Sequence, residues 1–139
     1  MSKIHTPAPT ISETAKSAAS GAALTNCRTG RTLARRVTLR RRTWEVALGL
    51  MFRRGIGEDE AMVFCLPKAG IREAGVHMLF VPFPIALLWL DEEFRVVDKV
   101  LARPWRSGYR PKTAARFFIE AHPSRLDLVQ EGDELQWRD

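Results

Sequence analysis

The segment VHMLFVPFPIALLWL, residues 76–90, constrains the fold more than any other part of the chain. It is shorter than the roughly 20 apolar residues that a transmembrane helix requires. Pro82 and Pro84 remove backbone donors and push Val81 and Phe83 into extended conformations. We therefore predict a strand through VHMLF, a bend at the prolines and a second strand through IALLWL. A continuous apolar run of this length is typical of a strand buried on both faces.

The rest of the chain predicts one domain of mainly short strands. Residues 1–22 are rich in Ser, Thr, Ala and Pro and predict a disordered tail, and residues 23–139 predict a single domain. The best helix is TWEVALGLMFRR, with Thr43 as its N-cap and Gly55 after its end. The other expected elements are two short strands around a turn at Thr29-Gly30, strands in EAMVFCLP, FRVVDKVL and AARFFIEA, one or two helical turns near Pro123, and a closing strand after a Gly132-Asp133 turn. These elements predict an α+β fold with mainly antiparallel pairing, because most neighbouring strands can be joined by short turns.

The net charge of +6 is concentrated in one region. Residues 1–42 contain nine Lys or Arg and one Glu, whereas residues 43–139 contain thirteen basic and fifteen acidic residues. In RRVTLRRR, apolar and basic residues alternate, so Arg36, Arg40 and Arg42 are predicted to lie on the solvent face of a strand. Such a pattern is typical of an edge strand protected by charge. The alternative is a polyanion-binding surface, although the absence of aromatic residues among the arginines disfavours nucleic acid.

Cysteine use and the N-terminal sequence predict a cytoplasmic protein. Cys27 and Cys65 are far apart and lack the spacing of a zinc site or a disulfide framework. The first residues contain no apolar core of about 7 to 15 residues such as a secretory signal needs. We expect reduced thiols, no metal and no cofactor.

Several segments together resemble one known family. TWEVALGLMFRR, EAMVF, VHMLFVPFPIALLWLDEEFRVVDKV, RPWR and VQEGDEL occur in the order seen in the domain-of-unknown-function 192 (DUF192) family of small bacterial and archaeal proteins. The resemblance runs from about Leu24 to Trp137, with the GLMFR element at residues 49–53. It implies a compact, mostly antiparallel β fold like a distorted small barrel, with one or two packed helices. It implies no reaction, since the family has no established biochemical role.

The chain departs from the family pattern at two positions. The His-x-Met-like element falls on His77 and Met78, and the Phe-Pro-Ile-Asp element falls on residues 83–86. Ala86 therefore stands where the family usually has an acid, and Val46 stands where many members have a basic residue. A role that depends on that carboxylate is not expected of this chain.

His77 is one candidate for chemistry. Neighbouring strand residues point to opposite faces, so His77 and Met78 cannot readily bind one metal ion together. A buried core histidine is the favoured interpretation, because a ligand or general-base role would need Cys65 or His122 nearby. Core packing is also expected of the methionines Met51, Met62 and Met78.

Catalytic templates are weak in this sequence. The acids Asp91, Glu92 and Glu93 are typical of a solvated turn, and Asp98 follows in the next strand. There is no GxSxG elbow, P-loop or dinucleotide fingerprint. The balance is against an enzyme, without deciding the question.

The loop LARPWRSGYRPK, residues 101–112, is the most suggestive segment. It places Trp105 and Tyr109 among Arg103, Arg106 and Arg110, with Lys112 at its end. This mixture suits a planar or anionic partner held by stacking and charge-assisted hydrogen bonds. In the alternative interpretation, Trp105 plugs the open end of a barrel and the arginines contact solvent or nearby acids.

Two functions from different classes follow. The favoured one is a non-enzymatic binding or accessory module whose basic face engages an acidic protein or another polyanion through Arg36, Arg40 and Arg42, with or without the 101–112 loop. The alternative is a small-molecule-binding protein or enzyme with a pocket at the barrel mouth. Its candidate residues are His77, Arg103, Trp105, Arg106 and Tyr109.

Overall fold

Short strands make up most of the structure, a computed structural model that describes residues 23–41, 50–51 and 53–138. Its elements are β1 (Ala23–Asn26), β2 (Thr32–Ala34), β3 (Arg36–Arg40), β4 (Glu60–Gly70), β5 (Ile85–Leu90), β6 (Val96–Ala102), β7 (Ala115–Ala121), the 3-10 helix η2 (Pro123–Leu128) and β8 (Leu135–Arg138). The predicted tail, and most of the predicted helix TWEVALGLMFRR, lie outside the described residues. In the described part the helical content is η2, which begins at Pro123 as expected, so the one or two packed helices are not supported.

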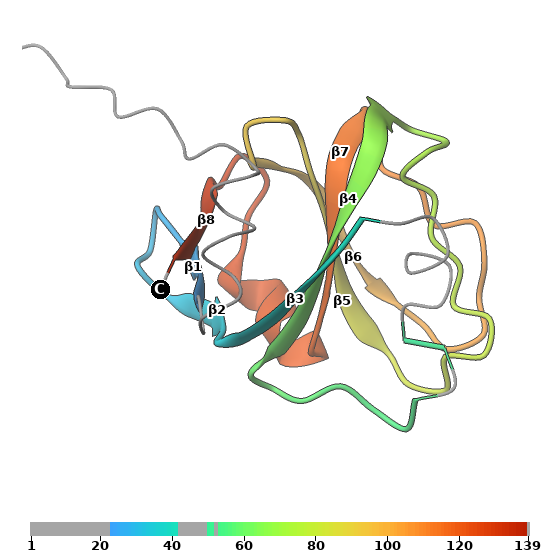
Figure 1. Ribbon diagram of the computed structural model, residues 1–139. Helices are drawn as coiled ribbons and strands as arrows, with labels where there is room; N and C mark the ends of the chain where they lie inside the picture. The colour runs from blue at the N-terminus through green and yellow to red at the C-terminus, as the bar shows by residue number, and fades with distance from the viewer. Residues whose placement is uncertain (1–22, 42–49, 52, 139) are drawn as a thin grey trace, which may run out of the picture.

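The strands form two sheets (Figure 1). One is three-stranded with the order β2-β1-β8, and the other is five-stranded with the order β3-β4-β7-β5-β6. Each sheet has its own edge strands, so the described strands do not close into one barrel and the barrel implied by the resemblance is not confirmed. A mainly β structure with mostly antiparallel pairing is confirmed.

One strand pair departs from the predicted antiparallel topology. β3 pairs with β4 in parallel, with Arg36 opposite Glu60 and Arg40 opposite Phe64. A parallel pair needs a connection of about a dozen residues or more, and residues 41–59 provide one. The general expectation of antiparallel pairing does not hold for this pair, because a long connection and not a short turn separates the two strands.

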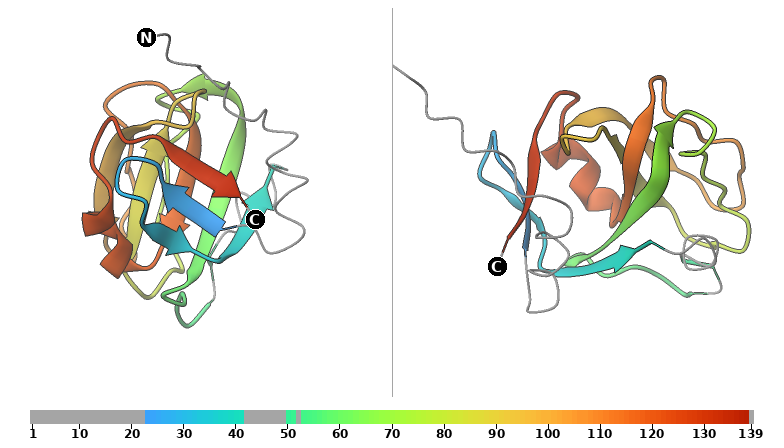
Figure 2. Two further views of the ribbon diagram at one scale, coloured as in Figure 1. Left: turned by 90° about the vertical axis from the view of Figure 1, so that its left-hand side faces the viewer. Right: turned by 45° about the horizontal axis from the view of Figure 1, so that its top comes forward.

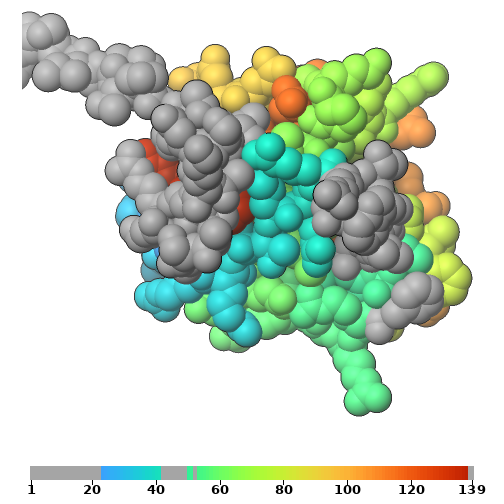
Figure 3. All heavy atoms as spheres, viewed as in Figure 1, coloured from blue at the N-terminus to red at the C-terminus, as the bar shows by residue number. Residues whose placement is uncertain are grey.

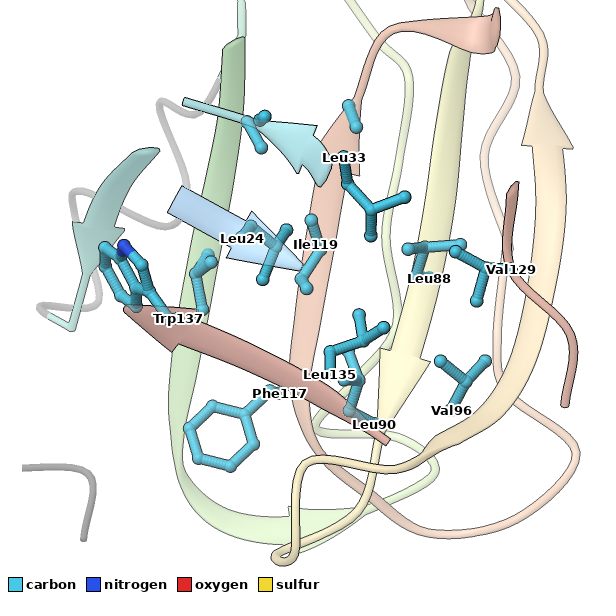
Figure 4. Packing of buried hydrophobic residues seen from close by; sticks show 14 of the residues in the cluster. Leu24, Leu33, Leu88, Leu90, Val96, Phe117, Ile119, Val129, Leu135 and Trp137 are labelled. Carbon is cyan, nitrogen blue, oxygen red and sulfur yellow. The ribbon is translucent and has the colours of Figure 1, made fainter. Parts of the chain in front are cut away.

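Strand β5 is buried on both faces, as predicted for IALLWL. All six β5 residues are buried. Ala86, Leu88 and Leu90 belong to a first cluster that fills the space between the two sheets (Figure 4), whereas the alternate β5 side chains belong to a second cluster on the opposite face. The first cluster also contains Leu24 and Trp137 from the three-stranded sheet. Full burial of one such side chain stabilises the fold by roughly 1.5–3 kcal/mol.

The predicted strand through VHMLF does not form. Val76 makes an isolated bridge to Tyr109, and the chain then turns, with Phe80 at a φ of 61°. Positive φ interrupts an extended strand. Residues 71–84 instead form a loop that ends at β5. This loop and the one after β6 lie at the end of the molecule away from the three-stranded sheet (Figures 1 and 2).

Candidate functional site

Two loops pair with each other at this end of the molecule. We call residues 74–81 and 103–110 the loop ribbon. Val76 N donates to Tyr109 O at 2.8 Å, and Tyr109 N donates to Val76 O at 3.1 Å. Trp105 N donates to Met78 O at 2.9 Å. The fold therefore brings His77 to the same place as the 101–112 loop, as the pocket hypothesis required.

The loop ribbon exposes two aromatic rings on strained backbone. Phe80 is 46% exposed and Trp105 is 55% exposed, and their ring centroids lie 5.5 Å apart with an interplanar angle of 65°. Their φ angles are 61° and 65°, in the left-handed region that non-glycine residues rarely adopt. Leu79, also in the ribbon, is 42% exposed. Trp105 does not plug a barrel, because its ring faces solvent, and such strain is often found at functional sites.

Four exposed arginines lie in or next to the loop ribbon. They are Arg72, Arg103, Arg106 and Arg110. Within the described part of the chain their guanidinium groups have no ion-pair partner, whereas other basic side chains do: Arg53 pairs with Glu60, and Lys112 with Glu131. Phe80, Trp105 and these four arginines together are called the aromatic–arginine surface below.

His77 and Tyr109 differ from the other candidates in their contacts. His77 is exposed, and its Nδ1 accepts a hydrogen bond from Leu79 N at 3.3 Å. The expected buried core histidine is therefore wrong, because the loop turns the imidazole outward. Tyr109 is half-buried, and its hydroxyl oxygen accepts from Arg103 N at 2.9 Å. Tyr109 thus stabilises the loop that carries the arginines.

A small open pocket of about 190 Å³ lies beside the ribbon. Its cationic or titratable lining residues are Arg72, His77 and Arg110. Gly75, Val76, Gly108 and Tyr109 complete the wall. The sequence indicated this region through His77 and the 101–112 loop but missed Arg72 and Phe80, whose positions depend on the fold of the loop after β4.

The arginine strand β3 is an edge strand, as its charge pattern indicated. Arg36 is exposed, Arg40 is half-buried with a buried Nε that has no acceptor among the described residues, and Arg42 lies outside them. In the space-filling view β3 lies beside the segment 53–60 (Figure 3), which includes Glu60. Burial opposes ionisation of Glu60, but hydrogen bonds from Arg53 and Gly57 and the charges of Arg53 and Arg36 hold its pKa below the usual value. Acidic charge thus lies next to Arg36.

The other expected chemical groups lie apart. Cys65 is in the first cluster, and His122 is the N-cap of η2, so neither joins His77. No group of three or more His, Cys, Asp or Glu in the described ranges could hold a metal ion. Asp91 Oδ1 accepts from the amides of Glu93 and Arg95, as expected of a turn. The methionines pack in the core, as predicted: the second cluster contains Met62 and Met78, and Met51 packs against it.

Glu120 is a buried acid that the sequence analysis missed. It is 6% exposed in β7, the central strand, and it lies opposite Met62 on one side and Leu87 on the other. Its Oε2 has no hydrogen-bond partner among the described residues. Burial raises the pKa of Glu120 to about 8. The signal was present in the sequence as a single acid inside the apolar strand FFIEA.

Comparison with known proteins decides the family. The model of the DUF192 family, described as an uncharacterised ACR family, matches residues 24–137. The chain belongs to the DUF192 family. Ala86, where the resemblance implied an acid, is fully buried opposite Ala121.

Relatives of this DUF192 chain have names that state no activity. A UPF0127 protein of Thermococcus kodakarensis is 38% identical over 91 residues, which is 64% of this chain and 56% of that protein. A UPF0127 protein of Pyrococcus horikoshii is 38% identical over 93 residues, covering 66% of this chain and 77% of the relative. The chain thus aligns with little more than half of the Thermococcus relative.

A solved structure supports the fold. The crystal structure of a protein of unknown function from Novosphingobium aromaticivorans matches with a TM-score of 0.71 and 23% identity, over 84% of this chain and 83% of that one. None of the helices in the described residues is long and apolar enough to cross a membrane.

Proposed function

We propose that this protein is a non-enzymatic binding module that engages an acidic polypeptide through the aromatic–arginine surface. Supporting the proposal is a single observation: four exposed guanidinium groups without ion-pair partners in the described residues lie in or next to the loop ribbon, which also carries two exposed aromatic side chains on backbone of positive φ. Trp, Tyr and Arg are the residues most enriched among those that dominate binding energy at protein interfaces. A cluster of one sign of charge also steers an oppositely charged partner toward the surface.

The loop ribbon is a better candidate than β3 for this role. The basic side chains of β3 are explained by its position as an edge strand. In addition, the charge of Arg36 lies close to that of Glu60. The ribbon arginines, in contrast, have aromatic neighbours that can add stacking and cation–π contacts. A cytoplasmic location is part of the same proposal and is tested by imaging a fluorescent fusion.

Binding of fluorescein-labelled poly-L-glutamate, followed by anisotropy at low and high salt, tests the proposal. We expect Arg103→Gln/Arg106→Gln to weaken binding at least about tenfold, because each lost charge removes a contact with the polymer. Arg35→Gln/Arg36→Gln removes the same charge from exposed positions at the start of β3 and should weaken binding much less. Binding should also decrease steeply with salt.

Three outcomes would overturn the proposal. Failure of the wild-type protein to bind the polymer at low salt would remove the function itself. A larger loss in Arg35→Gln/Arg36→Gln than in the ribbon variant would transfer binding to the arginine strand. Tighter binding of a single-stranded oligonucleotide than of polyglutamate at equal salt would favour a nucleic acid over an acidic polypeptide.

A further inference from the structure

Building on the proposed binding role, we propose that the pocket beside the loop ribbon is a carboxylate site. Arg72, His77 and Arg110 hold one carboxylate of an acidic peptide, and Phe80 and Trp105 contact an apolar side chain of the same peptide. The pocket therefore selects peptides in which an acidic residue is followed closely by an apolar one, and does not merely prefer negatively charged peptides.

The charge of the pocket favours an anion. Arg72 and Arg110 come from two different loops and both line the pocket, and neither has an ion-pair partner within the described residues. No acidic side chain is among the lining residues. The Nδ1 of His77 accepts a hydrogen bond from Leu79 N, so the neutral ring carries its proton on Nε2 and donates from that atom. All three side chains can therefore donate hydrogen bonds to a carboxylate.

The size of the pocket favours a single functional group. Its volume of about 190 Å³ is several times the roughly 30 Å³ that one water occupies in the liquid. It is smaller than the roughly 300–1,000 Å³ of sites that enclose a whole small molecule. Gly108, with a φ of 83°, and Gly75 leave parts of the wall without side chains, so a ligand can approach the backbone there.

The position of the aromatic rings limits how far apart the carboxylate and the apolar side chain can lie in the peptide. His77 and Phe80 are three residues apart, so their Cα atoms are at most about 11 Å apart. In an extended peptide, side chains two residues apart lie on one face at a spacing of roughly 7 Å. A carboxylate and an apolar side chain separated by one residue therefore fall within this limit.

Titration of the 15N-labelled full chain with acetyl-Asp-Gly-Leu-amide tests the inference. We expect chemical shift changes at the amides of Gly75 and Gly108 and at the indole of Trp105. Acetyl-Asn-Gly-Leu-amide should bind at least about tenfold more weakly, because it has the same shape without the charge. Acetyl-Asp-Gly-Ser-amide should shift the glycine amides but not the indole. Acetyl-Leu-Gly-Gly with a free carboxyl terminus tests whether a chain end serves as well as a side chain.

Variants assign the effect to the pocket. Arg72→Gln/Arg110→Gln should lose the preference for the Asp peptide over the Asn peptide, whereas Arg35→Gln/Arg36→Gln should keep it. Equal binding of the Asp and Asn peptides by the wild type, or an unchanged preference in the pocket variant, would overturn the carboxylate site. If the wild type still binds polyglutamate in that case, only the carboxylate-site proposal is wrong. If the wild type does not bind polyglutamate at all, the proposed function itself is wrong.

Discussion

Glu120 makes the stability of this protein depend on pH in a direction opposite to that of most acids. Burial raises its pKa to about 8, and in the unfolded chain the pKa returns to about 4.5. Between these values the folded state binds one more proton than the unfolded state, so the free energy of unfolding decreases as pH rises. The stability that the folded protein gains from holding this proton is fully present below about pH 4.5 and is lost by about pH 8.

Glu120→Gln should remove this dependence, because the amide does not titrate. We expect the variant to be more stable than the wild type at pH 8, by at most about 5 kcal/mol, and similar to it at pH 4.5. Urea unfolding at both pH values measures the difference. If the free energy of unfolding changes with pH by the same amount in both proteins, Glu120 is not protonated in the folded state.

Asp133 shows the opposite behaviour at the turn before β8. Hydrogen bonds from Arg28 hold its pKa well below the usual range, against the effect of burial, and Gln130 N and Asn26 add further bonds. Its contribution to stability is present above about pH 4 and is lost as pH falls toward the lowered pKa. We expect Asp133→Asn to destabilise the fold by roughly 2 kcal/mol or more at pH 7, because an amide NH2, which can only donate, replaces one of the two oxygens that accept these hydrogen bonds. Thermal unfolding at pH 7 and pH 3 checks this, since the gap between wild type and variant should narrow at the lower pH.

At the scale of elements, the loop ribbon combines strain with exposure. Trp105→Gly relieves a positive φ that costs about 1–3 kcal/mol in a non-glycine residue, and it removes a ring that is already 55% exposed. We expect the variant to unfold within about 1 kcal/mol of the wild type or to be more stable, while its affinity for polyglutamate falls.

Phe94 provides a matched control for this prediction. It has a φ of 62°, but its side chain is half-buried and packs against Phe117, with the two ring centroids 5.2 Å apart. Phe94→Gly should therefore be destabilising by about 2–3 kcal/mol, because lost packing exceeds the strain relieved. Equal destabilisation by Trp105→Gly would show that the exposed ring supports the fold.

The sequence predicted those elements whose pattern is local. IALLWL, AARFFIEA and the closing strand have apolar runs that only buried strands satisfy, and the structure confirms them. The parallel pairing of β3 with β4 could not be predicted, since pairing across the 41–59 connection depends on distant contacts. The 101–112 loop was recognised from its own composition. Arg72 and Phe80 were missed because their role depends on the loop opposite, and His77 was misassigned because Phe80 ends the apparent strand.

At the scale of the whole molecule, the order of the strands predicts where the fold is most resistant to opening. β7 has β4 on one side and β5 on the other, and clusters of apolar side chains on both faces. β2 and β3 are edge strands. In native-state hydrogen exchange we expect the amides of β7 and β5 to exchange most slowly and those of β2 and β3 to exchange faster. Equal protection of β3 and β7 would instead show that the outer edge of β3 is covered.

The pairing of β1 with β8 has a practical consequence for how this domain can be joined to other chains. Ala23 lies opposite Arg138, so the two ends of the fold leave it from neighbouring points, at the end of the molecule away from the loop ribbon (Figure 1). A domain whose ends meet can be inserted into a surface loop of a host protein, or circularly permuted with a short linker from residue 138 to residue 23. In an insertion the ribbon points away from the attachment point, so its exposed side chains stay accessible to a partner.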